Sequence, residues 1–487
     1  MKAFILKVAS GSAAAALAAT LAAGMGCTSA APEKEAVQPL KVSDNRRFLV
    51  TKDGKPFFWL GDTGWLLHKL DREQTERYME DRRAKGFNVI QTSVLHSLNV
   101  KNVYGDKAVA DMDASKPLLT EGCDPGDSLQ YDYWDHVDYA IDVAAQKGMY
   151  VAIVAVWGTN VKNGLVSREQ AAAYATFLGE RYADCTNVIW INGGDVVGAD
   201  SSETWGIIGN TLREYAPKHL ITFHPFGRSR SSEWFHTAPW LDFNMVQSGH
   251  RTYGQDPNGI GQDTWRHITV DYSLTPTKPT IDGEPSYENI PHGLHDWHLE
   301  RYRHLRPKDY SPAASQPLWQ ADDVRRYAYW SVFAGGMGFT YGHNSVMQML
   351  LPGDSLPGAY GATMLWTDAL NAEGALQMQH LKNLMLSRPF LERTPDSSLV
   401  ANQGERYDHI QATRGKAYAL LYTFNGREVQ VNMGKIDGRE VKVSWYNPRN
   451  GELTEVGRVK NEGVAAFTPP SPEVRNGNDW TLILDGI

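Results

Sequence analysis

Short apolar runs alternate with segments of helical periodicity through most of the chain, and this alternation predicts its fold. Eight runs of β-type residues recur, and each ends in small or polar residues; they are 57–60, 87–92, 150–156, 188–191, 220–223, 243–246, 279–282 and 337–341. Between them, apolar residues spaced three and four apart predict helices, as in 72–85, 131–147, 168–182 and 322–334. Repeated strand–helix units of this kind predict a parallel (β/α)8 TIM barrel of the α/β class.

An open, doubly wound sheet is the alternative to a closed barrel. Such a sheet usually has a glycine-rich phosphate loop after its first strand, and the residues after 57–60 contain none. The pattern changes after about residue 395, where alternating runs are separated by Asn425-Gly426, Asp437-Gly438 and Asn450-Gly451. Alternation with such turns predicts a small antiparallel β-sandwich. We therefore expect a barrel over 42–392 and a sandwich over 393–487.

The first 27 residues have the pattern of an export signal. Lys2 and Lys7 flank a short apolar start, an Ala-rich segment follows, and small residues precede Cys27. The sequence before Cys27 resembles a bacterial lipobox, although Gly24 stands where Leu is usual. We expect Cys27 to be lipidated and 28–41 to be a linker, with plain secretion as the alternative. The chain is then an exported periplasmic or surface lipoprotein of a Gram-negative envelope, and a lipid anchor is its only expected contact with a membrane.

Composition and charge exclude several classes of function. The formal net charge is −8 and no basic block exists, which argues against nucleic acid as a partner.

Cys123 and Cys185 could form a disulfide or remain two buried thiols. The set of His292, His295 and His298 has a spacing that wraps around a helix, so we predict no metal, and we predict no cofactor. Esterase and phosphotransfer motifs are absent from the sequence.

Two carboxylates at the ends of predicted strands are the candidate catalytic residues. Asp195 follows the glycine pair 193–194 at the end of the fourth run, and Glu284 follows Gly283 at the end of the seventh. Taken singly, Asp195 could be a helix cap and Glu284 a surface residue of a turn. In an eight-stranded ring these two ends lie on opposite sides of one rim, so the carboxylates can face each other. Glycoside hydrolysis needs such a pair.

Other strand ends supply groups that could hold a sugar by hydrogen bonding or stacking. Each could equally be structural. These candidate substrate-binding residues are Asp62, Trp157, His224, Gln247, His250, Tyr287, Tyr341 and His343.

The motifs that contain these residues resemble a known family. The segments 58–65, 85–90, 187–195, 282–285, 323–330 and 338–343 are similar to the apiosidase-like barrels of glycoside hydrolase family 140. The tail at 443–452 resembles the small domain that follows such barrels and is sometimes labelled collagen-binding. We regard that domain as a packing partner of the barrel, since nothing in the sequence supports collagen binding.

The resemblance implies hydrolysis of apiosyl linkages in plant pectin, notably in rhamnogalacturonan II side chains. It implies an acid/base at Asp195 and a nucleophile at Glu284, and hence a retaining mechanism. The sequence departs from the expected pattern at a few places that could alter the sugar subsites: Asn192, Val196-Val197, Asn344, Met347 and the loop 124–130. The alternatives are a barrel glycosidase with a different sugar specificity and a non-catalytic glycan-binding lipoprotein.

Overall fold

A computed structural model describes residues 37–257, 259–292, 317–471 and 473–487. The predicted signal peptide, Cys27 and most of the predicted linker lie outside the described residues. Within them, no helix is long and apolar enough to cross a membrane.

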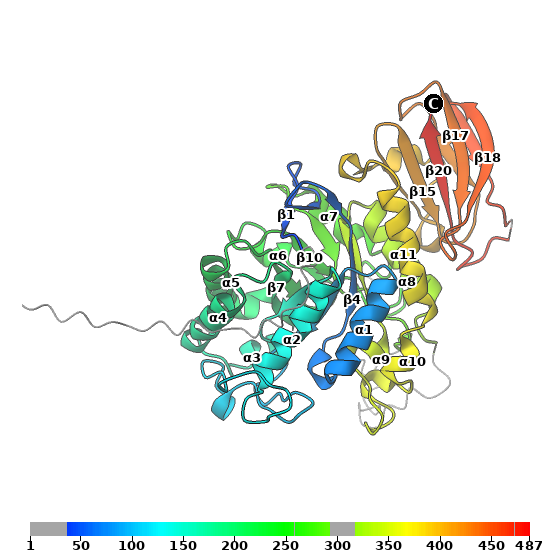
Figure 1. Cartoon of the computed structure of the whole chain (residues 1–487). Coiled ribbons are helices and arrows are strands. Elements are labelled where there is room, and N and C mark those ends of the chain that lie inside the picture. The colour runs from blue at the N-terminus through cyan, green and yellow to red at the C-terminus, as the bar shows by residue number, and fades with distance from the viewer. Residues whose placement is uncertain (1–36, 258, 293–316, 472) are drawn as a thin grey trace, which may run out of the picture. The chain divides into compact units, whose positions relative to one another are not determined.

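Eight parallel strands form a closed barrel in the described part of the chain (Figure 1). They are β4 (Trp59–Thr63), β5 (Val89–Ser93), β6 (Tyr150–Val154), β7 (Val188–Val196), β8 (Ile221–Pro225), β10 (Asn244–Gln247), β11 (Thr280–Asp282) and β12 (Gly338–Tyr341). Parallel ladders join them in the order β8-β7-β6-β5-β4-β12-β11-β10, and the short antiparallel β9 (Ser229–Arg230) adds to β10. A hydrogen bond from the Asp242 N–H to the Ile221 carbonyl, 2.9 Å, links the chain entering β10 to β8. The predicted barrel is confirmed.

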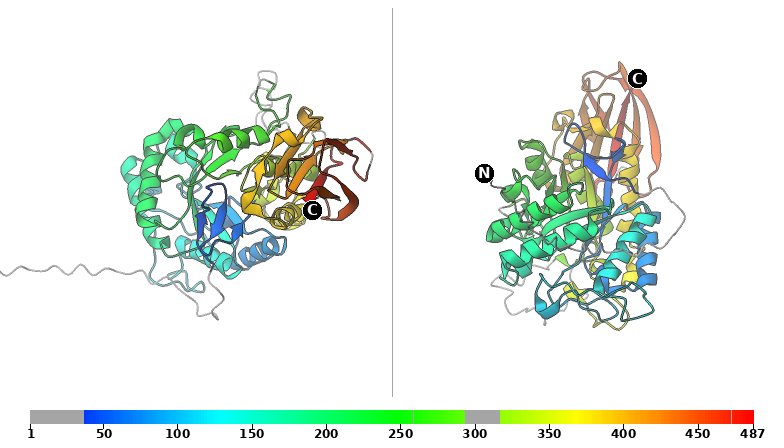
Figure 2. Two further views of the ribbon diagram at one scale, coloured as in Figure 1. Left: turned by 90° about the horizontal axis from the view of Figure 1, so that it is seen from above. Right: turned by 60° about the vertical axis from the view of Figure 1, so that its left-hand side comes forward.

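Helices surround the strands, as the views in Figure 2 show. The longer ones are α1 (Arg72–Ala84), α2 (Tyr133–Gln146), α4 (Arg168–Tyr182), α5 (Ser202–Tyr215), α7 (Trp265–Ser273), α8 (Ala321–Phe333) and α11 (Glu373–Leu386). The short ones are α3 (Gly158–Lys162), α6 (Ser232–Phe235), α9 (Asn344–Met347) and α10 (Trp366–Ala369). Asp71, Asp132 and Ser167 begin α1, α2 and α4 with reciprocal capping boxes, which satisfy backbone N–H groups that a helix start leaves unpaired.

A three-stranded antiparallel sheet precedes the barrel. It consists of β1 (Leu40–Val42), β2 (Leu49–Thr51) and β3 (Pro56–Phe57). β1 begins two residues inside the segment predicted to be a linker, because Leu40 is buried and pairs with Thr51. Cys185 is a free, half-buried thiol, so the disulfide between Cys185 and Cys123 that the sequence left open is not formed.

The C-terminal domain is antiparallel, as the sequence predicts. One sheet holds β13 (Thr394–Pro395), β14 (Ile410–Arg414), β15 (Tyr418–Thr423), β20 (Trp480–Gly486), β17 (Glu440–Tyr446) and β18 (Leu453–Lys460). A second sheet holds β16 (Val429–Asn432) and β19 (Val464–Phe467). The three predicted turns use Gly426, Gly438 and Gly451 at φ of 72°, 109° and 76°, a region that residues with a Cβ rarely adopt. Apolar side chains such as Val429, Trp445 and Leu482 form its core.

Candidate active site

Glu284 follows β11 in a turn that glycine makes possible. A Cβ at Gly283 would lie 2.7 Å from the Met245 side chain, and a Cβ at Gly249 would lie 2.5 Å from the Pro285 backbone. The turn is held against β10, because the Gly283 N–H donates to the Val246 carbonyl at 2.9 Å. Glu284 is therefore placed at the carboxyl ends of the strands, where barrel enzymes hold their active sites.

Two imidazoles face the two carboxylate oxygens of Glu284. His224 Nε2 lies 2.9 Å from Oε2, and His250 Nε2 lies 3.2 Å from Oε1. The opposite ring nitrogens accept backbone N–H groups, since Asp195 N donates to His224 Nδ1 at 3.2 Å and Tyr287 N approaches His250 Nδ1 at 3.4 Å. A ring nitrogen that accepts a hydrogen bond carries no proton, so the hydrogen that faces Glu284 is on Nε2 in both residues. Both histidines thus present N–H donors to Glu284.

These contacts decide the charge of Glu284. Burial by itself raises the pKa of a carboxyl group, because it removes water from the charged form. The contacts from His224 and His250 outweigh burial and lower the pKa of Glu284 to about 2. Glu284 is consequently an ionised carboxylate at neutral pH, although it is buried.

Asp195 has the opposite electrostatic environment. It follows two glycines at positive φ, Gly193 and Gly194, and itself has a φ of 56°. Burial raises the pKa of Asp195, and the charge of Glu284 raises it further, while His224 and Gln247 oppose the shift in part. The structure therefore brings the two predicted carboxylates into one site and separates their protonation behaviour, the pattern expected of an acid and an anion that work together.

A group of aromatic rings packs beside His224. Trp157 is half-buried and its ring centroid lies 6.3 Å from that of His224 and 5.1 Å from that of Trp65. His96 lies against the Trp157 ring at 4.7 Å. Trp157 was predicted, whereas Trp65 and His96 were not, although both follow the ends of predicted strands.

The other predicted residues divide into two groups. Gln247 faces Asp195, and Tyr287 packs edge-on against His250 with ring centroids 4.8 Å apart. Burial, and next the charge of Glu284, raises the pKa of Tyr287. Together with Trp157 and the two histidines, these residues surround the carboxylate pair.

Asp62, Tyr341 and His343 are instead bound to other protein groups. Asp62 Oδ2 accepts a hydrogen bond from Tyr78 at 2.6 Å and lies 2.8 Å from Arg82 Nε. The Tyr341 hydroxyl donates to Glu288 at 2.6 Å. His343 Nδ1 accepts the Ser345 N–H and caps α9. All three are buried, and their placement favours structural roles over the predicted contact with substrate.

Tyr360 lies near enough to Asp195 and Glu284 for their charges to act on it, and the sequence analysis does not name it. It lies in the long loop after β12, is 49% exposed and has a φ of 53°. Asn344 Nδ2 donates to its carbonyl at 2.9 Å. Burial, followed by the charges of Asp195 and Glu284, raises the pKa of Tyr360. Its loop carries no periodic pattern, so no signal in the sequence indicated its position.

No group of three or more metal-ligating side chains occurs among the described residues. Of the three histidines considered for a metal, His295 and His298 lie outside the described residues. His292 packs on Trp319, with ring centroids 4.1 Å apart.

Comparison with known proteins adds to this geometry. Residues 43–392 match the family model described as "Apiosidase-like, catalytic domain", and residues 394–485 match "Putative collagen-binding domain of a collagenase". A solved structure named "Glycoside hydrolase" is 44% identical over 92% of this chain and 97% of that chain, with a TM-score of 0.83. A glycoside hydrolase family 5 structure from Bacteroides vulgatus ATCC 8482 is 42% identical over 92% and 93%, with a TM-score of 0.83. A comparison of the sequence with curated proteins found no match.

The position of Asp62 generates a prediction about stability. Asp62 and Arg82 are both fully buried, and removing one partner leaves the other charge without its closest counter-ion. We expect Asp62→Asn to lower the free energy of unfolding by about 3–5 kcal/mol, measured by urea denaturation. The control is Glu80→Gln, which breaks the partly exposed pairs with Lys147 and Arg83 and should cost about 1 kcal/mol or less for each pair. An Asp62→Asn protein of normal stability with a raised KM would instead identify Asp62 as a substrate ligand.

The position of His224 generates a prediction about the pKa of Glu284. His224→Phe removes the donor that lies 2.9 Å from Oε2, so less of the burial cost of the charge is offset. The pKa of Glu284 should therefore rise from about 2, as measured by ¹³C NMR of labelled glutamate during a pH titration. His380→Phe, at a histidine on α11, should leave it unchanged. An unaltered titration in His224→Phe would contradict the proposed source of the lowered pKa.

Proposed function

Because the chain belongs to the apiosidase-like family of glycoside hydrolases, we propose that it cleaves apiosyl linkages in plant pectin, with side chains of rhamnogalacturonan II as its substrate. The chain is a glycoside hydrolase, and its substrate is a glycan. The observation that carries the proposal is the pairing of an ionised Glu284 with an Asp195 whose pKa is raised. Hydrolysis of a glycosidic bond needs a carboxylate and a carboxylic acid together.

In the proposed mechanism, Glu284 is the nucleophile and Asp195 the acid/base. Glu284 attacks the anomeric carbon, the bond to the leaving oxygen breaks, and Asp195 donates its proton to that oxygen. Asp195 then takes a proton from a water molecule, whose oxygen attacks the same carbon. The bond from that carbon to Glu284 breaks, and the product keeps the original configuration at the anomeric carbon. The donors from His224 and His250 keep Glu284 charged before attack, and the charge of Glu284 helps to keep Asp195 protonated.

Two aromatic side chains support the binding of a sugar at the site. The half-buried Trp157 offers an aromatic surface beside His224, and sugars commonly stack on such surfaces. Tyr360 is exposed on the loop after β12, and the charges of Asp195 and Glu284 help to raise its pKa. We propose that these two rings flank the sugar bound next to the scissile bond.

The positions at which the sequence departs from the expected family pattern have different relations to this site. Asn192 is buried and donates to the Trp205 carbonyl at 2.8 Å, on the helix side of β7. Asn344 instead holds the Tyr360 carbonyl and, at 3.1 Å, the Asn289 carbonyl. We propose that Asn344, through the Tyr360 loop, is the departure that bears on sugar specificity.

We also propose that the enzyme acts outside the cytoplasm as a lipoprotein anchored at Cys27. The support for this proposal is the sequence pattern of residues 1–27. An exported enzyme would meet pectic fragments before they enter the cell.

The substrate is tested by incubating the enzyme with rhamnogalacturonan II oligosaccharides. We expect free apiose, or an oligosaccharide that begins with apiose, to be identified by mass spectrometry and ion-exchange chromatography. A parallel panel of aryl pentosides and deoxyglycosides covers the other sugar specificities. Hydrolysis of a member of that panel with apiosyl linkages left intact would replace the apiose assignment, and binding without turnover of any glycan would contradict catalysis.

The mechanism is tested by changing each carboxylate in turn. Glu284→Gln should lower kcat by at least about 10³-fold, and Asp195→Asn by about 10²–10⁴-fold. Since Asp195 must be protonated for the first step, activity should fall as pH rises through its pKa. Azide should restore turnover in Asp195→Ala, and ¹H NMR should show the retained configuration in the wild-type product. Glu455→Gln, at an exposed surface pair, is the control. An inverted product would exclude Glu284 as the nucleophile.

A further inference from the structure

Helix α8 holds both sides of the turn that carries Glu284. Ser331 Oγ donates to Asp282 Oδ2 at 3.0 Å, two residues before Glu284. Two residues after Glu284, Ser286 Oγ donates to the Tyr327 hydroxyl at 3.1 Å. Tyr327 and Ser331 are four residues apart and lie on one face of the helix. The turn around Glu284 therefore cannot shift relative to α8 without breaking buried hydrogen bonds.

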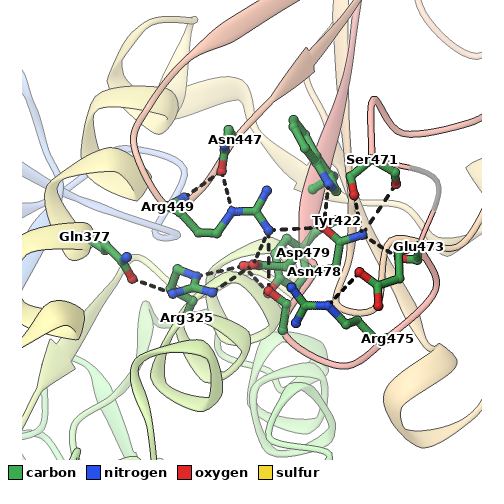
Figure 3. A network of polar contacts seen from close by, with 12 residues as sticks. Arg325, Gln377, Tyr422, Asn447, Arg449, Ser471, Glu473, Arg475, Asn478 and Asp479 are labelled. Atoms are coloured by element: carbon green, nitrogen blue, oxygen red, sulfur yellow. Dashed lines mark hydrogen bonds and ion pairs between the residues drawn. The ribbon is translucent and has the colours of Figure 1, made fainter.

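The opposite face of α8 is bound to the C-terminal domain. Arg325 Nε and Nη2 each lie 2.9 Å from an oxygen of Asp479, in a bidentate ion pair (Figure 3). Both side chains are buried, with exposed fractions of 3% and 0%. Tyr422 donates to Asp479 Oδ2 at 3.0 Å and stacks on Tyr329 of α8 with ring centroids 4.7 Å apart. Arg325 and Tyr329 are again four residues apart, so a single helix face meets this domain.

A buried ion pair is a costly way to hold two domains together. The desolvation of both charges offsets much of their attraction, and an apolar pair would often give equal stability. What a planar, bidentate guanidinium–carboxylate pair supplies is direction, because both hydrogen bonds are lost when the partners rotate. The Arg325–Asp479 pair therefore fixes the position and rotation of α8 more than it adds to the stability of the protein.

We infer that the C-terminal domain positions Glu284: Asp479 holds Arg325 of α8, and α8 holds the turn that carries the carboxylate. Asp479 is then a positioning residue, not a catalytic one, since it acts through α8. This inference rests on the proposed function, in which Glu284 attacks the sugar. Because small displacements of a reacting group are costly in rate, loss of Asp479 should affect kcat more than KM.

The chain contains a matched control for this contact. Arg388, just after α11, forms a second bidentate pair with Asp485 on β20, at 2.8 and 2.7 Å. This pair also joins the C-terminal domain to the rest of the chain, but it does not involve α8. A substitution at Asp485 therefore removes a bidentate contact of the same geometry, in a more exposed place, without the proposed path to Glu284.

The test compares Asp479→Asn, Tyr422→Phe and Asp485→Asn with the wild-type enzyme. We expect Asp479→Asn to lower kcat about 10- to 100-fold, with KM changed about twofold or less. Tyr422→Phe keeps the ring and removes one donor to Asp479, so its effect should be in the same direction and smaller. Asp479→Glu should recover part of the loss. Asp485→Asn should leave kcat unchanged, even if the thermal midpoint falls.

Hydrogen exchange gives a readout that does not depend on the substrate. In the full-length protein, amides of residues 282–288 should exchange faster in Asp479→Asn and not in Asp485→Asn. Failure of the apiose assignment would appear separately, as a wild-type enzyme inactive on pectic fragments, and any glycoside that it does hydrolyse then serves for the kinetics. Equal kcat per folded molecule in Asp479→Asn and Asp485→Asn, with equal exchange at 282–288, would overturn the inference. If Asp479→Asn does not fold, Tyr422→Phe decides by the same two measurements.

Discussion

Glu284 keeps its charge inside the barrel because an imidazole N–H faces each of its two oxygens. His224 comes from β8 and His250 from the segment after β10, so the charge of one side chain depends on strand ends that only a closed barrel brings together. Backbone N–H groups orient the two imidazole donors, because they donate hydrogen bonds to the Nδ1 atoms on the opposite side of each ring. One of these belongs to Asp195, so the backbone of the second carboxylate orients a donor for the first.

This arrangement couples the two carboxylates without a direct bond between them. Burial favours the neutral form of both. The histidines favour the ionised form of Glu284 instead. The negative charge of Glu284 then favours the neutral form of Asp195 further. The difference in protonation thus arises from one asymmetry, the number of N–H donors that each carboxylate receives. The glycines at 193, 194 and 283 permit the asymmetry, since they let the backbone turn where a Cβ would collide with neighbouring atoms.

The sequence predicts the barrel well because its signal is repeated. Each of the eight predicted runs overlaps one of the eight parallel strands of the barrel, and the C-terminal turns fall at glycines with positive φ. The rim of the barrel follows from the ends of those runs, which is why Asp195, Glu284 and both histidines could be named in advance. What a run end does not reveal is the direction of a side chain, because successive residues of a strand point to opposite faces. Asp62 and Asn192 lie at run ends, yet the first pairs with Arg82 of α1 and the second with Trp205 of α5.

The sequence pattern does not predict the positions of residues in irregular segments, because these segments have no periodicity. Tyr360 reaches the site through a loop held by Asn344 and Gln348, contacts that depend on the folded loop and not on any local spacing. The contact between Arg325 and Asp479 spans 154 residues and joins segments whose patterns predict only a helix and a strand. The support for Glu284 also comes from distant segments: the imidazoles of His224 on β8 and His250 after β10 set its charge, while α8 sets the position of its backbone. Charge and position are therefore controlled by different parts of the chain, and a substitution can disturb one and leave the other intact.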